Sequence, residues 1–390
     1  MSVPISHRSL QVTDCYLPPV RHVYVHLPFC AHRCGYCDFV TVTGLRGQHT
    51  AYVDALLAEL ESEGHVLQDP QVTDCYLDSL RLETVYLGGG TPTLTEPAAL
   101  ARLLAALPPA DEVTVEANPE TVSSAVAALL REHGVNRVSL GVQSFRSHLL
   151  ETLERRASPG DVRRAVSILR EAGFDNVSLD LIYGIPGQSE DDLRRDLDDA
   201  LALEPEHLSC YELEAKPGTR FTHAHRAELE RQADAMEGYF ERVVETLSAA
   251  GYRWYETANF CRPGRMARHN LAYWRGRDYL GIGLGAVSTV GRVRWRNAPS
   301  LARYVAALSR GEPPPREHEP LPDDVRRRER VMLGLRLDEP LRLGGLEQTI
   351  DVPALDRLER LGLAQRLDGA LTLTSRGRFL GGAVTAELLA

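Results

Sequence analysis

Three cysteines within eight residues carry the strongest chemical signal in the chain. Cys30, Cys34 and Cys37 have the spacing C-x3-C-x2-C and follow a short run of β-branched and aromatic residues. Three thiolates this close together can bind three corners of an iron–sulfur cube, which leaves the fourth iron without a protein ligand. An open coordination position is where a metal site becomes reactive, as in catalytic zinc centres. The spacing therefore predicts a 4Fe-4S cluster with one open iron.

Two other uses of these cysteines fit the sequence less well. A structural zinc site needs four nitrogen or sulfur ligands, often as two C-x2-C pairs, and the chain has no second C-x2-C or C-x2-H pair. A disulfide framework is disfavoured because the cysteines are few and no signal peptide precedes them. The dispersed cysteines are expected to be small buried thiols, namely Cys15, Cys75, Cys210 and Cys261.

Length and composition predict a globular protein with one large and one smaller domain. The chain has 390 residues, of which 43% are hydrophobic and 25% charged. Its formal net charge of −10 argues against a protein that binds nucleic acid through bulk electrostatics. No apolar run is long enough to cross a bilayer, and residues 1–17 lack the pattern of a signal peptide. We therefore expect a cytoplasmic protein, where thiols and iron–sulfur clusters persist.

Strand and helix patterns alternate between residues 22 and 250. The six expected strands lie at residues 22–27, 83–87, 112–117, 137–142, 177–183 and 207–213. Six strand–helix units in order predict an α/β fold with a parallel sheet and right-handed crossovers. Glycine-rich and polar stretches fall directly after the strands, as at the C-terminal mouth of a TIM-like barrel. We therefore predict a partial (β/α)6 barrel over 22–250, with a Rossmann-type open sheet as the alternative, weakened by the lack of a G-x-G-x-x-G motif.

The remaining chain divides into shorter parts. Residues 1–21 read as an N-terminal arm, and the heptapeptide at 11–17 recurs identically at 71–77 without a physical explanation. Residues 251–312 are expected to extend the barrel with strands at 252–259 and 279–290. The stretch 311–322 holds five prolines and reads as a connection. Residues 323–390 predict helices followed by a hairpin turning at Asp368-Gly369, a winged-helix-like α+β domain that we expect to pack or act as a lid.

Beyond spacing, the cluster motif resembles that of the radical S-adenosylmethionine (radical SAM) enzymes. Tyr24 stands six residues before the first cysteine, and Tyr36 lies within the motif. Within these enzymes the chain resembles the family of oxygen-independent coproporphyrinogen oxidase and its heme-chaperone relatives, over about residues 22–380. The stretches that carry the resemblance are YLGGGTPT at 86–93, VEANP at 115–119, LGVQSF at 140–145, LDLIYGIPGQ at 179–188, RHNLAYW at 268–274 and DYLGIG at 278–283.

The resemblance implies S-adenosylmethionine as a cofactor bound to the open iron, where one electron would cleave its sulfonium to methionine and a 5′-deoxyadenosyl radical. It assigns the methionine end to Gly89, Gly90 and Thr91, and further cofactor contacts to Glu116, Gln143, Arg155, Asp180, Tyr24 and Tyr36. Each residue also has an ordinary structural role open to it. The glycines could form a tight turn, the carboxylates could be caps or solvated acids, Arg155 could pair on the surface beside Arg156, and the tyrosines could be core residues.

Phe39 separates two branches of that family. The oxidases carry a further cysteine at this place, whereas the form Cys37-Asp38-Phe39 resembles the heme chaperones. This resemblance implies a protein that binds heme and passes it to apo-proteins such as respiratory enzymes, without oxidising coproporphyrinogen. Heme, heme-accepting apo-proteins and an electron donor are the implied partners, and nucleic acid is not among them. His269 of the H-N-x-x-Y-W segment is the implied heme ligand, although a lone histidine is more often hydrogen-bonded structure.

One position departs from the chaperone pattern. Many chaperones have histidine where this chain has Val287, which is closer to the oxidase branch at this point. Two alternatives to the heme chaperone therefore stay open. One is a radical enzyme acting on a porphyrin or another small molecule, as an oxidase or a methylating or cyclopropanating relative. The other is a cluster-bearing interaction protein without turnover.

Overall fold

The computed structural model describes residues 20–44, 46–67, 81–216 and 219–389. The predicted N-terminal arm falls outside this part of the chain, apart from its last two residues. Both copies of the repeated heptapeptide, with Cys15 and Cys75, also lie outside the described residues. Within the described part, no helix is long and apolar enough to cross a membrane.

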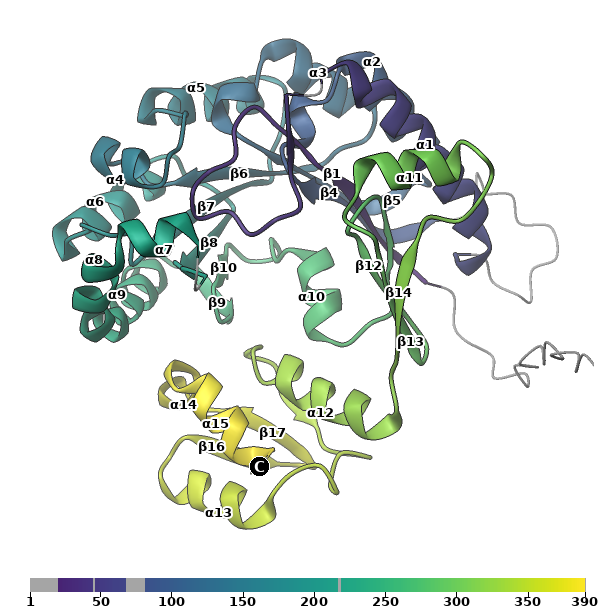
Figure 1. Cartoon of the computed structure of the whole chain (residues 1–390). Helices are drawn as coiled ribbons and strands as arrows, with labels where there is room; N and C mark the ends of the chain where they lie inside the picture. Colours follow the sequence, from purple (N-terminus) through teal and green to yellow (C-terminus); the bar gives the residue numbers. More distant parts are fainter. Residues whose placement is uncertain (1–19, 45, 68–80, 217–218, 390) are drawn as a thin grey trace, which may run out of the picture.

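A nine-stranded sheet forms the centre of the molecule, with the order β11-β1-β4-β5-β6-β7-β8-β10-β9 (Figure 1). Its six consecutive parallel strands are β1 (His22–Leu27), β4 (Leu82–Gly89), β5 (Ala110–Ala117), β6 (Arg137–Gln143), β7 (Val177–Tyr183) and β8 (His207–Glu212). Each predicted strand therefore exists, and each pairs with the next in sequence. The α/β class and the partial barrel are confirmed.

Helices cover the outer side of this sheet because both its faces carry apolar residues that must be buried. They are α1 (His49–Glu63), α2 (Pro97–Ala106), α3 (Ser124–Glu132), α4 (Ser147–Thr152), α5 (Pro159–Glu171), α6 (Glu190–Leu201) and α9 (Met236–Ala249). Capping boxes begin α5 and α6, at Ser158 with Asp161 and at Ser189 with Asp192. The predicted long helix over 226–250 is interrupted: α8 (Arg226–Gln232) reaches α9 through a 3₁₀ turn (Ala233–Ala235), and the short α7 (Arg220–Ala224) precedes it.

The two ends of the sheet differ from the prediction. The stretch 252–259 is a hairpin of β9 (Arg253–Glu256) and β10 (Asn259–Cys261), which continues the sheet antiparallel to β8. The stretch 279–290 is not one strand. β11 (Leu280–Ile282) pairs parallel with β1, and the chain then turns through Gly283 and Gly285 into β12 (Val287–Val290). Both glycines have positive φ, of 106° and 70°, which ends the extended conformation.

A second sheet with the order β12-β13-β14 stands beside the barrel. It contains β12, β13 (Val293–Asn297) and β14 (Arg316–Pro320), and α11 (Leu301–Leu308) links the last two. The proline-rich stretch 311–322 is therefore more than a connection, because it contains β14. The prolines do not prevent this, since β14 is an edge strand and its Pro320 is the last residue of the ladder.

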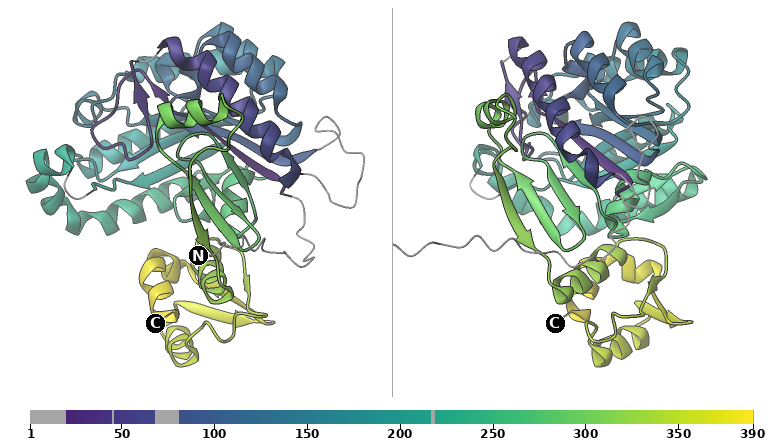
Figure 2. Two further views of the ribbon diagram at one scale, coloured as in Figure 1. Left: turned by 45° about the vertical axis from the view of Figure 1, so that its right-hand side comes forward. Right: turned by 90° about the vertical axis from the view of Figure 1, so that its right-hand side faces the viewer.

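The C-terminal residues form a separate lobe below the barrel, reached through β14 (Figure 2). The lobe has its own hydrophobic core, centred on Val331, Leu355 and Leu371. Its elements are α12 (Asp323–Gly334), β15 (Leu341–Arg342), α13 (Val352–Arg360), β16 (Ala364–Leu367), β17 (Ala370–Leu373), α14 (Ser375–Phe379) and α15 (Gly381–Leu388). β16 and β17 form the predicted hairpin, and helices followed by this hairpin give the winged-helix-like arrangement.

Helix α10 (Arg268–Trp274) lies on the opposite side of the sheet from the outer helices and packs against β4 and α12. The backbone N–H groups of Arg268 and His269 at its start donate to the carboxylate of Glu112 in β5, at 3.2 Å each. A carboxylate at a helix N-terminus satisfies backbone donors that have no partner within the helix. This contact fixes α10 to the sheet.

A buried ion pair joins the barrel to the second sheet. The Glu59 carboxylate of α1 is fully buried and accepts from Arg316 at 3.0 Å, Tyr304 at 2.6 Å and the Gly283 N–H at 2.8 Å. Burial raises the pKa of Glu59, and these donors oppose that rise. The carboxylate therefore holds together segments that are more than 200 residues apart in the sequence.

We predict that Arg316→Ala lowers the free energy of unfolding by about 3–5 kcal/mol, because it leaves Glu59 buried without its counter-charge. Urea titration followed by circular dichroism measures this. The matched control is Arg102→Ala, which removes an exposed ion pair with Asp54 and should change stability by less than about 1 kcal/mol. Equal effects of the two variants would show that the buried pair is not a structural link.

Candidate cofactor site

A cavity of about 500 Å³ opens at the C-terminal mouth of the barrel. The segments that follow β1, β4, β5, β6 and β8 contribute to its lining, and β7 contributes Asp180 and Ile182 from within the strand. The predicted residues that line it are Cys30, Cys34, Tyr36, Cys37, Gly89, Gly90, Thr91, Glu116, Gln143, Arg155 and Asp180. Predicted residues from five successive strand–loop units therefore meet in one cavity, as the barrel prediction required.

The cysteine loop is closed at its base by a short parallel ladder. β2 (Phe29–Cys30) pairs with β3 (Val42–Thr43), so the loop between them projects over the cavity. Cys30 lies 3.6 Å from the Thr91 hydroxyl, and Arg155 Nη1 lies 3.8 Å from Cys34 Sγ. Burial raises the pKa of the Cys30 and Cys37 thiols. The Arg155 guanidinium beside Cys34 favours an anionic group at the cysteine loop, because its positive charge offsets the negative charge of partly desolvated thiolates.

The spacing of the thiols fits a multi-iron group better than a single ion. Among the described residues, no three His, Cys, Asp or Glu side chains converge closely enough to hold one metal ion. The three corners of a cube each need a separate thiolate, so such convergence is not required for a cluster. All three thiols are free and partly exposed to the cavity. The donor set therefore fits an iron–sulfur cube with one iron open to the cavity.

The glycine loop packs directly beneath the cysteine loop. The Gly90 N–H donates to Leu27 O and the Thr91 N–H to Phe29 O, both at 2.8 Å. A Cβ on Gly90 would lie 2.5 Å from the carbonyl carbon of Pro28, closer than any side chain permits. Only glycine allows this backbone approach. The glycine stretch therefore sets the position of the cysteines as well as lining the cavity.

Two half-buried carboxylates face the cavity from neighbouring parts of the sheet. Glu116 accepts from the Tyr86 hydroxyl at 2.7 Å and from the Gly89 N–H at 2.9 Å. Burial, together with the nearby Asp180 carboxylate, raises the pKa of Glu116 to about 7 despite these two donors. Burial also raises the pKa of Asp180, which accepts from the Ser139 hydroxyl at 3.1 Å. Both acids therefore favour a ligand that brings hydrogen-bond donors or positive charge.

Asn118 connects parts of the site and was missed as a site residue. Its Nδ2 donates to the Thr91 hydroxyl at 2.9 Å, and its Oδ1 accepts from Arg155 Nη2 at 2.8 Å. Arg155 also donates to the Gly141 carbonyl at 2.6 Å, whereas Arg156 is exposed. Arg155, and not its neighbour Arg156, therefore lines the cavity. Asn118 stands within the VEANP stretch, and its position directly after a strand was the available signal.

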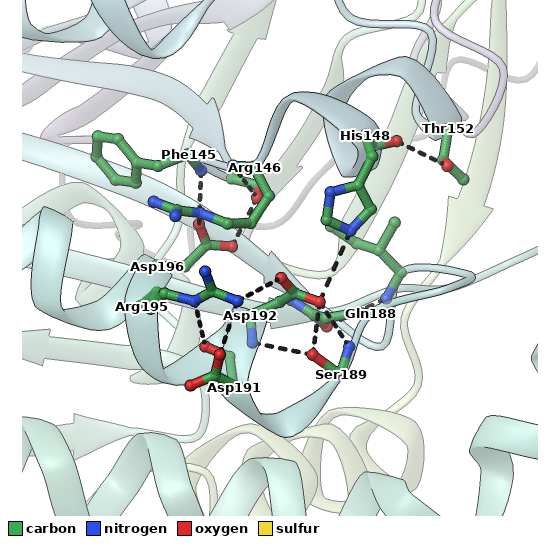
Figure 3. A network of polar contacts seen from close by, with 12 residues as sticks. Phe145, Arg146, His148, Thr152, Gln188, Ser189, Asp191, Asp192, Arg195 and Asp196 are labelled. Carbon is green, nitrogen blue, oxygen red and sulfur yellow. Dashed lines mark hydrogen bonds and ion pairs between the residues drawn. The ribbon is translucent and has the colours of Figure 1, made fainter.

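Gln143 has an unusual backbone conformation at the end of β6. Its φ is +68°, and the pairing of β6 with β7 shifts register here. A non-glycine residue at positive φ must be held by its surroundings, and such strain concentrates at functional sites. Figure 3 shows the support behind it: the buried Asp196 accepts from the Phe145 N–H and the Ser144 hydroxyl, both at 2.6 Å, and pairs with Arg146.

The start of α6 also takes part in the contacts that support Gln143. The Asp192 carboxylate accepts from Ser189 at the helix start and lies 3.6 Å from the His148 ring of α4 (Figure 3). Asp192 and Asp196 are four residues apart, and both are largely buried. They therefore lie on one side of α6 and hold the β6–α4 loop against it. This support keeps Gln143 directed at the cavity.

The two predicted tyrosines have different places. Tyr36 lines the cavity and lies edge-on to Phe221, with ring centroids 6.5 Å apart. Tyr24 does not line it. Tyr24 stacks on Tyr86 at 6.2 Å, and its hydroxyl is hydrogen-bonded to His26 at 3.0 Å. The structure therefore places Tyr24 behind Tyr86, in the core role that the sequence left open.

His269, on α10, is buried in the protein and does not line the cofactor cavity. Its Nδ1 is hydrogen-bonded to the Thr84 hydroxyl and its Nε2 to the Tyr273 hydroxyl, both at 2.7 Å. Burial lowers the pKa of the ring to about 3, so the imidazole is neutral. Both nitrogens are engaged. His269 therefore has the structural, hydrogen-bonded role that the sequence left open, and its ring has no free nitrogen for a heme iron.

Comparison with known proteins agrees with this geometry. Residues 24–200 match the model of the Radical SAM superfamily. The heme chaperone HemW of Mycobacterium tuberculosis is 40% identical over 384 residues, covering 94% of each chain, and that of Bacillus subtilis is 32% identical, covering 95% of this chain and 99% of its own. Coproporphyrinogen III oxidase (HemN) of Escherichia coli shares the fold, with a TM-score of 0.78 at 23% identity, over 96% of this chain and 92% of its own.

We predict that Gly90→Ala prevents cluster assembly, because the new Cβ would push the Pro28 backbone and the cysteine loop out of place. Iron and sulfide retained after anaerobic reconstitution measure this, and we expect a loss of at least about tenfold. Gly238→Ala is the control, since a Cβ there meets no atom within 4 Å. Normal iron content in Gly90→Ala would show that the loops are not coupled by this contact.

Proposed function

The chain belongs to the radical SAM family that includes the heme chaperones HemW, and from this we propose that it binds heme and delivers it to apo-proteins. The observation that carries the proposal is 40% identity to a heme chaperone across nearly the whole length of both chains. Respiratory enzymes are the proposed acceptors, a reduced electron-transfer protein the proposed donor, and the cytoplasm the proposed compartment. The acidic chain is not proposed to bind nucleic acid.

The proposed cofactors are a 4Fe-4S cluster and S-adenosylmethionine, both held at the barrel mouth. Cys30, Cys34 and Cys37 would hold the cluster. Gly89, Gly90 and Thr91 would bind the methionine end of the cofactor, and its other parts would meet Tyr36, Glu116, Gln143, Arg155 and Asp180. When bound, the pair supplies one-electron cleavage of the sulfonium bond.

The protein's own residues have definable roles at this place. Arg155 offsets the negative charge of the thiolates and is itself fixed by Asn118 and Gly141. Glu116 is a hydrogen-bond acceptor whose geometry is already set by Tyr86 and Gly89, so little reorganisation accompanies binding. Tyr36 forms an apolar wall that limits the access of water to the cavity.

Phe39 bears on the choice of reaction. It lies at the rim of the cavity with 65% of its surface exposed, and it supplies no further thiol. We therefore do not assign coproporphyrinogen oxidation to this chain. The alternative remains a radical enzyme that acts on a porphyrin or another small molecule, which the open 500 Å³ cavity would admit.

We predict that Cys34→Ala abolishes the four-iron absorption band after anaerobic reconstitution, while Cys261→Ala, which removes a buried thiol elsewhere, retains it. The wild-type protein should also bind heme saturably, as followed by its Soret band, and pass it to an apo-hemoprotein. Absence of heme binding in a protein with an intact cluster, together with cofactor cleavage accelerated by an added porphyrinogen, would replace the chaperone with the alternative.

We predict that S-adenosylmethionine binding weakens as the pH falls below about 7. Glu116, with its pKa raised to about 7, must be ionised to accept hydrogen bonds from the cofactor. Its affinity is therefore full above that pH and falls by up to about tenfold per unit below it. Anaerobic calorimetry of the reconstituted protein at several pH values measures this. Glu116→Gln should bind more weakly with a flat profile, and an unchanged slope in this variant would exclude Glu116 as the titrating group.

A further inference from the structure

A second cavity of about 650 Å³ lies between the barrel extension and the C-terminal lobe. Its walls come from the turn after α10, from β12 and β13, and from one side of α12. Figure 1 shows α12 beneath α10 and beside the lower end of β13. None of the residues assigned to the cluster or to S-adenosylmethionine lines this cavity. Its volume lies within the range of sites for small molecules and cofactors.

Four arginines line the cavity without a counter-ion. Arg277 follows α10, and Arg326, Arg327 and Arg330 lie on α12 at the spacing of a single helix face. None of the four side chains makes a hydrogen bond or ion pair with any described residue; those of Arg277 and Arg326 are exposed, and those of Arg327 and Arg330 are half-buried. The chain as a whole is acidic, with a formal net charge of −10. A cluster of unpaired cations in an acidic protein indicates a place for an anionic ligand.

The carboxylates at the cavity wall are already engaged elsewhere. Glu329 forms a bidentate pair with Arg294 at 2.8 and 2.9 Å. Asp323 pairs with Arg292, and Asp278 accepts from the Gly291 N–H at 2.8 Å. Glu329 and Asp323 are therefore paired with other arginines, and Asp278 makes no ion pair with any of the four. The five arginines of the lining outnumber its three acids, which leaves net positive charge at the cavity.

Arg330 is the most constrained of the four. It is half-buried, and burial together with the neighbouring Arg277 and Arg275 lowers its pKa. A charge that is partly desolvated and repelled by its neighbours is costly unless a ligand compensates it. The arginine fork suits carboxylates, which it can bind through two parallel hydrogen bonds.

Apolar and aromatic side chains form another part of the lining. Tyr273, Tyr279, Leu333 and Leu346 contribute to the wall, and Met332 lies there with 51% of its surface exposed. The two tyrosine rings meet edge to face, with centroids 4.5 Å apart. The site thus joins a flat apolar wall to several arginines. It matches a ligand with a large apolar body and more than one carboxylate.

We propose that this cavity is the cargo site, in which the macrocycle of heme lies against the apolar wall and its two propionates bind Arg277, Arg327 and Arg330. This inference rests on the proposed heme-chaperone function and locates its binding site. The lining contains no histidine or cysteine. The iron can therefore meet only weaker ligands such as a tyrosine hydroxyl or the Met332 thioether, which suits a cargo that must be released.

His269 acts on this site as a positioning residue. Its Nε2 holds the Tyr273 hydroxyl at 2.7 Å, and Tyr273 lines the cavity. The H-N-x-x-Y-W segment thus contributes to the cargo site through its tyrosine, with the histidine behind it. Val287 lines neither cavity, so the departure from the chaperone pattern at this position leaves the cargo site intact.

The decisive experiment titrates heme into the full-length protein and follows the Soret band. Arg327→Gln/Arg330→Gln should bind heme at least about tenfold more weakly, because two charge-assisted hydrogen bonds are lost. Its thermal stability should not fall, since the change removes like-charge repulsion. Arg303→Gln is the control, an exposed arginine on α11 outside the cavity, and should bind heme as the wild type does.

A second ligand separates carboxylate recognition from simple apolar adsorption. Heme dimethyl ester lacks the propionate charges, so the wild-type protein should prefer free heme to the ester, and the double variant should lose this preference. If the wild-type protein binds heme and the double variant binds it with the same affinity, the assignment of heme to this cavity is wrong, but the proposed function still stands. Failure of the wild-type protein to bind heme at all would overturn the proposed function itself.

Two further outcomes would also overturn the assignment. A double variant that binds heme normally but no longer adsorbs to phosphatidylglycerol vesicles would assign the arginines to a lipid surface. An imidazole-ligated Soret spectrum in the wild-type protein that disappears in His269→Gln would place the iron at His269. We expect instead that His269→Gln weakens heme binding without changing the shape of the spectrum.

Discussion

The continuation of the β1–β4 ladder beyond the ends of its strands is the constraint on which the cofactor site depends. Gly90 and Thr91 donate to Leu27 and Phe29, so the two loops leave the sheet still bonded to each other. Because the strands are parallel, both loops emerge at the same edge. The cysteines are therefore positioned by main-chain hydrogen bonds from a glycine stretch some sixty residues away, before any cofactor adds its own interactions.

Charge is handled differently in three polar regions of the molecule. Glu59 is compensated within the protein by Arg316 and by neutral donors, and it serves as a structural link. At the barrel mouth, burial raises the pKa of Glu116 and of Asp180, and Arg137 beside Asp180 opposes the rise only in part. At the lobe interface, the side chains of four arginines make no ion pair with a described residue. The first region is complete in the protein alone, whereas the ligands proposed for the other two have opposite character.

Much of this arrangement followed from sequence because its signals are local. Strand–helix alternation identified the six parallel strands, and polar residues after strands predicted which side chains would meet. The errors came from long-range context. The prolines of 311–322 suggested a linker, yet an edge strand tolerates Pro320 at its end. Asn118 was missed because its role is to bridge Thr91 and Arg155, a relation that exists only after three loops have been brought together. The arginines of α12 gave no signal either, since only the structure shows that their acids are engaged elsewhere.

His269 shows why residue type alone misdirects an assignment. A histidine in a family associated with heme suggests an iron ligand. Here burial lowers the pKa of the ring, and two hydrogen bonds fix its orientation and occupy both nitrogens. The same ring stacks on Tyr86 at 5.1 Å, and Tyr86 donates to Glu116 in the cofactor cavity. On its other side it holds Tyr273 at the second cavity. The ring is thus a fixed spacer between two ligand sites, and a shift of α10 against β4 would alter Glu116 and Tyr273 together. A buried neutral imidazole suits that role, because it hydrogen-bonds in both directions without carrying a charge that either site would have to compensate.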